Sequence, residues 1–405
     1  MENGRPMSEA ISTRAFVYHR PGDVRTERRT ITLTPTDLLV KVRASARCGT
    51  DKTIYAKGHP KVDANAPIVL GHEFTGEIVR VGSDVRGLRE GIGYWEGRRL
   101  TDGDLDFPVG QRITCQSRIA RYRDGLMLLD DPITILSFSF DAAYAEYVRI
   151  PRELIQSGSV MRVPGSVSDE AGALVEPTAC ALESIFATPH PVGVNPDGSH
   201  RFASGPKRGG LACVIGSGTV SMIYALLCRV LGAGRVFVLV RSERKATAVR
   251  RCLGPGFEIV VEDPYDELPL ADRLRREVDI VNRLGELTGG ALFDDVVSAS
   301  ASPDAQRLML KLYTRGGYAV GACFGGTHSL VDAADIDQNH YRAAKTIGTS
   351  GCSNRGMERV IAMLADGSLS LEGFTSPQRY TLDSDPADFF TTQAGGLKPV
   401  LYPGG

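Results

Sequence analysis

A thiol, an imidazole and two carboxylates lie in glycine- or proline-marked segments of this chain. Cys48-Gly49-Thr50 and Gly71-His72-Glu73 come early, and Glu176 precedes Pro177 in the middle. Thiolate, imidazole and carboxylate groups together suit Zn²⁺, and a catalytic zinc site leaves one position free for water or substrate. Each fragment alone is more typical of a core residue or a helix-start acid. The combination predicts a zinc centre.

A glycine-rich turn lies between the strand that we predict over residues 211–215 and the helix that we predict over 221–231. The turn reads Gly216-Ser217-Gly218-Thr219-Val220, and Ser221 follows where Gly or Ala is usual. Backbone amides at such a helix N-terminus hold the pyrophosphate of a dinucleotide. By itself the turn is equally compatible with a structural role. After a strand and before a helix, it predicts a nicotinamide dinucleotide site.

The end of the next predicted strand, residues 235–240, bears on the choice between NADP and NAD. An NAD site of this kind usually has an acid here for the ribose 2′-hydroxyl. This chain instead has Arg241, Ser242 and Arg244, which suit a 2′-phosphate. We therefore favour NADP, with NAD as the alternative. The competing interpretation is a solvated helix start, with Glu243 reaching the ribose.

Two patterns of apolar and polar residues divide the chain. From residue 15 to about 150, alternating runs such as 38–42 and 76–82 predict strands. After residue 210, strands alternate with helices, which is typical of a parallel sheet. The elements predicted there, besides those already given, are helices over 243–253, 303–312 and 354–366 and strands over 294–298 and 317–321. Two polar stretches, 91–111 and 188–210, predict surface loops.

These two patterns predict an α/β protein of two domains. A strand-rich catalytic domain takes residues 1–187 and 346–405, and a doubly wound parallel-sheet (Rossmann) domain takes 188–345, with the active site in the cleft between them. The chain has 405 residues, which is long enough for two cores.

The amino-acid composition limits which binding partners and which cellular compartment are expected. The chain has 47 basic and 48 acidic side chains and a net charge of -1, which disfavours nucleic acid or an anionic membrane as a partner. No secretory leader or membrane-spanning run is expected. Eight dispersed cysteines without a C-x-x-C pair favour a reducing cytoplasm and buried thiols.

The order of the zinc-type residues and the dinucleotide turn resembles the zinc-dependent medium-chain dehydrogenase/reductase family, and within it the polyol branch related to sorbitol dehydrogenase. Residues 293–297 and 316–321 look like that family's nicotinamide-side strands and turns. Residues 348–351 and 395–400 look like those of the L-sorbose-1-phosphate reductases. The resemblance implies a GroES-like catalytic domain, a homodimer or homotetramer, and reversible oxidation of a secondary alcohol on a polyol, cyclitol, sugar or sugar phosphate.

The resemblance also implies roles for single residues. Cys48, His72 and Glu73 correspond to zinc ligands, and Glu176 to the glutamate that holds the metal's water or ligates in its place. Thr50 corresponds to the hydroxyl that relays the substrate proton. Whether Glu73 or Glu176 ligates directly is left open.

Two departures from the family pattern matter. Only Cys115 lies where many members carry four cysteines for a structural zinc, so one catalytic zinc and no structural zinc is expected. Thr53 lies where many alcohol dehydrogenases have a relay histidine, so the proton is expected to leave through water or ribose hydroxyls.

Other readings remain open. The same chemistry serves a dehydrogenase of an amino-alcohol, such as a 3-hydroxy amino acid or an aminocyclitol, and a non-catalytic dinucleotide-binding module is the alternative outside enzymology. Tyr94 and Trp95 either line an entrance or anchor their loop. An arginine cluster is expected to be a solvated helix face: Arg273, Arg275 and Arg276. Histidines without a partner at ligand spacing are expected at the surface or in loops: His59, His190, His200, His328 and His340.

Overall fold

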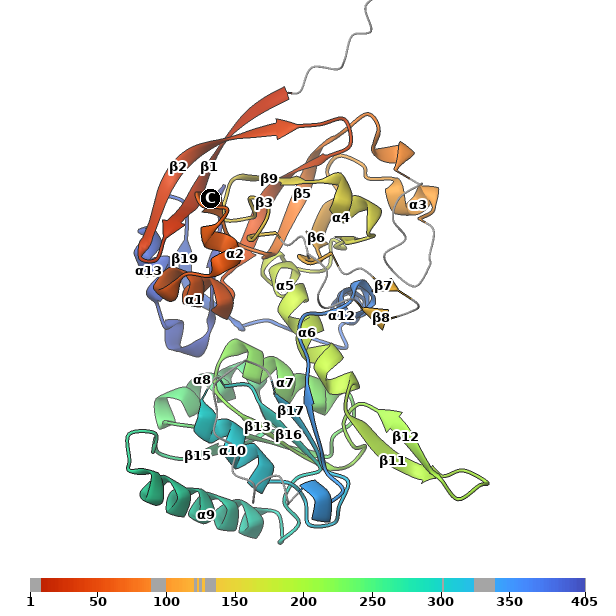
Figure 1. Cartoon of the computed structure of the whole chain (residues 1–405), viewed down its shortest axis with the longest axis vertical. Helices are drawn as coiled ribbons and strands as arrows, with labels where there is room; N and C mark the ends of the chain where they lie inside the picture. The colour runs from red at the N-terminus through yellow and green to blue at the C-terminus, as the bar shows by residue number, and fades with distance from the viewer. Residues whose placement is uncertain are drawn as a thin grey trace, which may run out of the picture.

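The computed structural model describes residues 9–88, 100–119, 122–123, 126–127, 136–300, 302–323 and 339–404. Tyr94, Trp95 and His328 lie outside these ranges. The described chain forms a strand-rich half and a helix-flanked parallel sheet, one above the other in Figure 1. No helix among the described residues is long and apolar enough to span a membrane.

The strand-rich half is built around one mixed sheet, with the order β10-β6-β5-β3-β20-β19 and β9 also paired to β3. Its strands and those of the outer sheet β2-β1-β4 are β1 (Glu9–Arg20), β2 (Asp23–Leu33), β3 (Leu38–Ala46), β4 (Ile68–Val69), β5 (Glu73–Val81), β6 (Arg112–Cys115), β9 (Tyr147–Ile150), β10 (Val160–Arg162), β19 (Thr375–Tyr380) and β20 (Lys398–Leu401). The C-terminal strand β20 pairs antiparallel with β3, so the end of the chain returns to the first domain.

Short helices and turns connect these strands. They are α1 (Gly49–Lys57), α2 (Pro60–Asp63), η1 (Val85–Gly87), α3 (Asp102–Leu105), α4 (Arg152–Gln156), α5 (Asp169–Ala173), α13 (Pro386–Thr391) and η2 (Ala394–Gly396). A small two-stranded sheet pairs β7 (Tyr122–Arg123) with β8 (Leu126–Met127). The predicted loop over 91–111 therefore contains one short helix in its described part, because Thr101 and Asp104 form a capping box that starts α3.

The second half is a parallel sheet with the order β15-β14-β13-β16-β17-β18. Its strands are β13 (Leu211–Ile215), β14 (Arg235–Val240), β15 (Glu258–Val261), β16 (Asp295–Ser298), β17 (Val320–Cys323) and β18 (Lys345–Gly348), and its helices are α7 (Thr219–Val230), α8 (Glu243–Leu253), α9 (Leu270–Leu287) and α10 (Pro303–Lys311). The prediction of α/β architecture is confirmed. The strand predicted over 317–321 was placed too early, because Gly317 and Tyr318 have positive φ angles and form a turn before β17.

Helices cover both faces of this sheet, which explains its apolar strands. Alternate residues of β13 enter different cores: Ala212 and Val214 pack with α7 and α8, whereas Cys213 and Ile215 pack with α9 and α10. The first core continues into α6 (Val175–Phe186) and α12 (Asn354–Ala365). The two halves are therefore joined by a shared apolar core.

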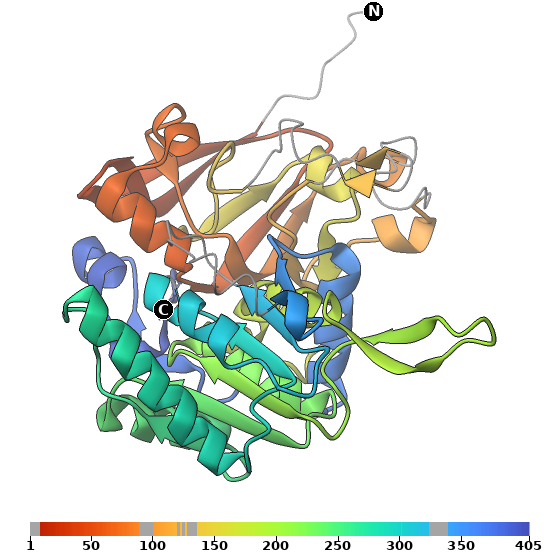
Figure 2. The same ribbon diagram turned by 60° about the horizontal axis from the view of Figure 1, so that its bottom comes forward.

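The predicted loop over 188–210 is wrong in part, because it contains a β-hairpin. β11 (Pro189–Val194) pairs with β12 (His200–Ser204), and Figure 2 shows this hairpin projecting from the body. Its prolines and its mostly exposed side chains give no alternation of apolar and polar residues. The predicted domain limits stay a prediction, and β18 crosses the limit at 345/346.

Candidate active site

Cys48 lies between the end of β3 and the start of α1. It is the N-cap residue of α1, and its Sγ accepts a hydrogen bond from the Thr50 backbone N–H at 3.4 Å. The preceding Arg47 is buried and donates to the Thr392 carbonyl at 2.8 Å, which ties this end of β3 to the C-terminal segment. The thiol is thus fixed at the N-terminal end of α1.

His72 is held by a buried chain of side chains. Its Nδ1 lies 3.7 Å from Asp51 Oδ1, and the other oxygen of Asp51 accepts a 2.6 Å hydrogen bond from the Tyr144 hydroxyl. Gly71, with φ +100°, lets the Tyr144 ring approach, since a Cβ there would lie 2.5 Å from it. A carboxylate behind the imidazole is the usual means of orienting a metal-binding histidine.

Cys48, His72 and Glu73 converge. One potential ligand atom from each lies within 4.8 Å of the others. Burial lowers the pKa of His72, but the negative charges of Cys48 and Asp51 outweigh burial and raise it above 6.5. A buried imidazole facing a thiol and a carboxylate is a donor set that fits Zn²⁺.

Glu73 has a cationic partner that the sequence did not reveal. The Lys398 Nζ contacts both carboxylate oxygens, at 2.6 Å from Oε1 and closer to Oε2, and both side chains are buried. The contact follows from strand order, because Ala46 of β3 pairs with Glu73 on one side and with Val400 of β20 on the other. No local pattern links residues 325 positions apart.

Glu176 lies close to that group but is not part of it at the 4.8 Å spacing. It is buried in the first turn of α6, and its Oε1 accepts a 3.5 Å contact from the Cys180 thiol. Burial raises the pKa of Glu176, although the nearby charge of His72 lowers it. Its close potential metal-binding neighbours are Cys180 and Cys352. The predicted four-residue ligand set thus divides between two neighbouring groups.

The predicted relay residues lie at the start of α1. Thr50 is exposed there, beside Cys48. Thr53 is also exposed, and its hydroxyl donates to the Gly49 carbonyl at 3.2 Å. The assignment of Thr50 as a proton relay stays a prediction.

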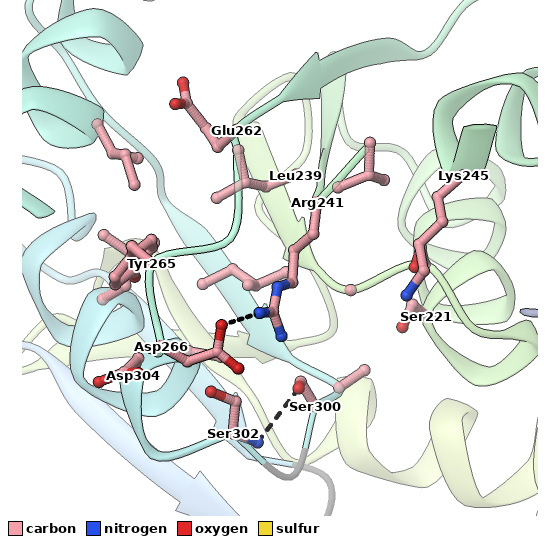
Figure 3. Close-up of a pocket in the computed structure, with 18 of the residues that line it drawn as sticks. Ser221, Leu239, Arg241, Lys245, Glu262, Tyr265, Asp266, Ser300, Ser302 and Asp304 are labelled. Carbon is pink, nitrogen blue, oxygen red and sulfur yellow. Dashed lines mark hydrogen bonds and ion pairs between the residues drawn. The ribbon is translucent and has the colours of Figure 1, made fainter. Parts of the chain in front are cut away.

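A pocket surrounds the glycine turn at the carboxyl end of the parallel sheet (Figure 3). It is lined by four of the residues that were predicted to contact the cofactor: Gly216, Ser217, Gly218 and Arg241. Gly216 has φ +138°, and a Cβ there would lie 2.4 Å from the Ser221 Oγ, so this position requires glycine.

The cationic wall of this pocket differs from the predicted set. Arg241, between β14 and α8, forms an ion pair with Asp266, and Lys245 in the first turn of α8 also lines the pocket (Figure 3). Burial and the charges of Arg241 and Arg244 lower the pKa of Lys245. Crowding of positive charge is typical of a phosphate site. Lys245 was missed, although it belongs to the same basic run as Arg241 and Arg244.

Four predicted cofactor residues do not line the pocket. Thr219 is buried, and its hydroxyl donates to the Phe374 carbonyl at 3.0 Å. Val220 packs against the apolar core, and Ser242 caps α8 by accepting from the Lys245 N–H. Arg244 is exposed on α8. Their assignments as direct cofactor contacts stay predictions, and Glu243 forms an ion pair with Arg250.

One C-terminal segment touches both sites. Gly396 of η2 packs on the glycine turn, where a Cβ would lie 2.8 Å from the Ser217 carbonyl, and Lys398, two residues on, binds Glu73. We call Cys48, His72 and Glu73 the metal group, and the pocket around the glycine turn the dinucleotide pocket. The two are therefore adjacent through residues 396–398.

Two groups that were set aside are resolved by the structure. His190 is buried, and its Nε2 lies 2.8 Å from Asp295 Oδ1, so the prediction of a surface histidine is wrong. The hairpin strand β11 brings it to Asp295 at the start of β16, an inner strand of the parallel sheet. Of the three arginines of α9, Arg275 is exposed and pairs with Asp272, as predicted for a solvated helix face. Arg273 and Arg276 are partly buried and pair with the buried Asp304 and Glu262, so the prediction is wrong for these two.

The chain is similar in sequence to known alcohol dehydrogenases. Residues 34–95 match the alcohol dehydrogenase GroES-like domain family. An L-threonine 3-dehydrogenase of Pectobacterium carotovorum is 26% identical over 283 residues, 69% of this chain and 67% of that protein. The chain spans about two thirds of the length of this relative.

Solved structures share the whole fold. A protein of Sinorhizobium meliloti described as a zinc-binding dehydrogenase and bound to NADP superposes with a TM-score of 0.74 at 22% identity, covering 97% of this chain and all of that one. Galactitol-1-phosphate dehydrogenase of Escherichia coli gives 0.69 at 19% identity, covering 96% and 100%. The chain is therefore similar in sequence to zinc-type medium-chain alcohol dehydrogenases, and it shares their fold of a GroES-like domain and a Rossmann domain.

Proposed function

We propose that this enzyme transfers a hydride between NADP and a secondary alcohol or ketone on a polyol, cyclitol, sugar or sugar phosphate, with one catalytic zinc at Cys48, His72 and Glu73. The observation that carries the proposal is the convergence of these three donors in a buried group next to a dinucleotide pocket. The finer resemblance to L-sorbose-1-phosphate reductases is part of this proposal, as is a homodimer or homotetramer.

Individual residues have separate roles in the proposed reaction. Zinc at this site would polarise the alcohol oxygen and lower its pKa, and the nicotinamide would accept or return the hydride. Asp51 and Tyr144 orient His72, and Lys398 holds Glu73. Thr50 would pass the hydroxyl proton toward solvent, and its exposure beside Cys48 supports this part of the proposal.

Within the proposed substrates, an anionic one is favoured by Arg118. A Cβ on Gly351 would lie 3.4 Å from its Nη1, and its buried Nε has no hydrogen-bond partner among the described residues. Gln116, two residues earlier, contacts Cys352 of the group that adjoins the metal site. A guanidinium whose Nε lacks a partner among the described residues suits a phosphate or carboxylate. L-Threonine, the substrate named for the curated relative, carries a carboxylate.

The choice of NADP rests on Arg241 and Lys245, which line the pocket, and on the absence of an acid at Val240. Asp266 already neutralises Arg241, so a 2′-phosphate must compete with a carboxylate for it. NAD remains the alternative that the binding experiment separates.

The test combines metal analysis with binding and turnover on one purified sample. We expect zinc in the protein, tighter binding of NADPH than of NADH by fluorescence titration, and turnover with a polyol or sugar-phosphate panel that also contains L-threonine. Zinc without hydride transfer to any alcohol supports the non-catalytic module instead. A metal-free protein that still turns over alcohols contradicts the zinc mechanism, and activity confined to L-threonine supports the amino-alcohol alternative.

A further inference from the structure

We propose that the outward side of α9 binds the same helix of a second copy of this chain, with the two helices antiparallel about a two-fold axis. This inference rests on the homo-oligomer that is part of the proposed function, and it names the surface through which two copies meet. It does not depend on zinc, on the substrate or on hydride transfer.

An apolar stripe runs along the exposed side of α9. Leu270, Leu274 and Val278 are four residues apart, so they lie along one side of the helix, and they are 56%, 38% and 54% exposed. Single exposed apolar side chains are common on soluble proteins, whereas a contiguous exposed patch marks a contact surface. Figure 2 shows α9 along the outer surface of the parallel-sheet half. We call these three residues the α9 stripe.

The opposite side of α9 fixes the rotation of the helix. Ile280 and Leu284 are buried in the core that packs on one face of the parallel sheet. Glu277 is fully buried and forms ion pairs with Arg307 and Lys311 of α10. Turning the helix would leave these buried charges without their partners, which is costly. The α9 stripe therefore cannot be buried by a rotation of its own helix.

The shape of α9 suits a second helix. Its 18 residues make it about 27 Å long. Gly285 is seven residues after Val278, on the same side, and a Cβ built on it would meet no atom within 4 Å. The distance between two packed helices depends on the side chains at their contact, so a glycine beside the stripe permits a close approach.

The charges beside the stripe favour a second copy as the partner. Arg275 and Asp279 are exposed and one helical turn apart on the same flank. In an antiparallel pair centred on Val278, Arg275 of each helix comes beside Asp279 of the other, so symmetry forms two ion pairs. Arg275 also pairs with Asp272 in its own helix, but that pair is exposed and contributes little, so a change of partner costs little. The surface is therefore complementary to itself.

The area of this contact sets its expected strength. One pair of helices buries less than the roughly 800 Å² per partner of a standard protein interface. We therefore expect micromolar association through α9, which depends on protein concentration within the range that sedimentation can cover.

The first experiment is sedimentation equilibrium of the full-length protein across roughly 1–100 µM. We expect Leu274→Glu to halve the mass of the largest species, because a charge in the stripe removes one interface. Leu287→Glu is the matched control, since Leu287 is 43% exposed but lies nine residues after Val278, on the other side of α9. Arg275→Glu and Asp279→Arg should each weaken association about tenfold, and the double variant should restore it.

The second experiment tests the two-fold axis. Residue 278 faces its own copy at the centre of the pair, so Val278→Cys should join two chains by a disulfide under mild oxidation. Glu286→Cys is the control, because the two copies of residue 286 lie about 24 Å apart along the helix axis and should not join. The wild-type protein supplies the baseline for the native cysteines.

Three results would overturn this inference. The first is a wild-type protein that stays monomeric at every concentration. The second is an oligomer whose mass is the same in Leu274→Glu and in which Val278→Cys forms no disulfide. The third is a lower melting temperature of Leu274→Glu at a concentration where the wild-type protein is monomeric, because the stripe then packs within its own chain. Zinc content and turnover of the wild-type protein decide the proposed reaction separately, so an inactive protein that pairs through α9 upholds this inference alone.

Discussion

The metal group and the dinucleotide pocket are neighbours, but they are assembled in opposite ways. The pocket comes from one continuous stretch of the chain, with lining residues from Ile215 to Leu308. The metal group joins the ends of β3 and β5 to β20, and its ion pair spans 325 positions. Its cations and anions are buried, whereas Arg241 and Asp266 of the pocket are about half exposed.

This difference has an energetic consequence. A buried ion pair costs much when one partner is removed, because the other charge is left without solvent or a partner. A half-exposed pair is screened by water and contributes little. Substitutions in the metal group should therefore affect both folding and catalysis, whereas those in the pocket should change affinity alone.

The largest effect is expected from Cys48→Ser. Loss of a thiolate ligand should remove the zinc and lower turnover by at least roughly 10³-fold, since a Lewis-acid metal contributes several kcal/mol to the transition state. NADPH affinity should stay unchanged, because the pocket does not depend on Cys48. Stopped-flow turnover and fluorescence titration measure the two effects. Full turnover of this variant after chelation would show that the metal is not catalytic.

Lys398→Met should destabilise the metal-free protein by about 3–5 kcal/mol, because it leaves the Glu73 carboxylate buried without a partner. Burial lowers the pKa of Lys398, but Glu73 outweighs burial and raises it above 10.5. The stabilisation is therefore complete at neutral pH and is lost only as the pH rises through that raised value. Urea unfolding measures the change.

The control for Lys398 is Lys207→Met, since Lys207 is half exposed and pairs with Asp294 at 2.7 Å. It should cost no more than about 1 kcal/mol. Lys398→Arg should restore most of the lost stability. Equal stability of Lys398→Met and the wild-type protein would mean that the buried pair is not formed.

Arg241→Ala should weaken NADPH binding about 10- to 100-fold with little change for NADH, since a charged hydrogen bond contributes roughly 1.5–3 kcal/mol. Asp266→Asn should act in the opposite direction, because it frees Arg241 for a 2′-phosphate. Fluorescence titration with both dinucleotides measures the ratio. Arg275→Ala, an exposed ion-paired arginine of α9, is the control. An unchanged ratio in Arg241→Ala would favour NAD.

The smallest effect is expected from Arg118→Met. We expect the KM of a phosphorylated polyol to rise by about tenfold, while kcat and the KM of the unphosphorylated polyol change little. Arg118→Lys should retain part of the affinity. A parallel rise of KM for both substrates would indicate a general role for Arg118 in shaping the cleft.

The sequence predicted those parts of the molecule whose signals are local. β14 and α8 have the predicted limits, because apolar periodicity and the Ser242 cap define them within a few residues. The glycine turn, with its required Gly216, is equally local. The grouping of Cys48, His72 and Glu73 was reached by resemblance, since no spacing rule joins these segments.

The parts that sequence reasoning missed depend on long-range pairing. Lys398 reaches Glu73 only because β20 lies beside β3, and Cys352 reaches Cys180 only because α12 packs on α6. His190 was taken for a surface residue because its partner, Asp295, lies 105 positions away. Strand order and helix packing are properties of the whole fold, and a window of sequence does not contain them.

The placement of residues 396–398 against both sites also bears on how the enzyme is made. Ribosomes deliver the chain from its N-terminus, and domains begin to fold as they emerge. Glu73 and the glycine turn are synthesised well before Gly396 and Lys398. A nascent chain that has not yet reached residue 398 therefore lacks the partner of the Glu73 carboxylate and the cover of the glycine turn. Both sites are thus assembled only after residues 396–398 have been made, and we expect ligands to bind at them after that point.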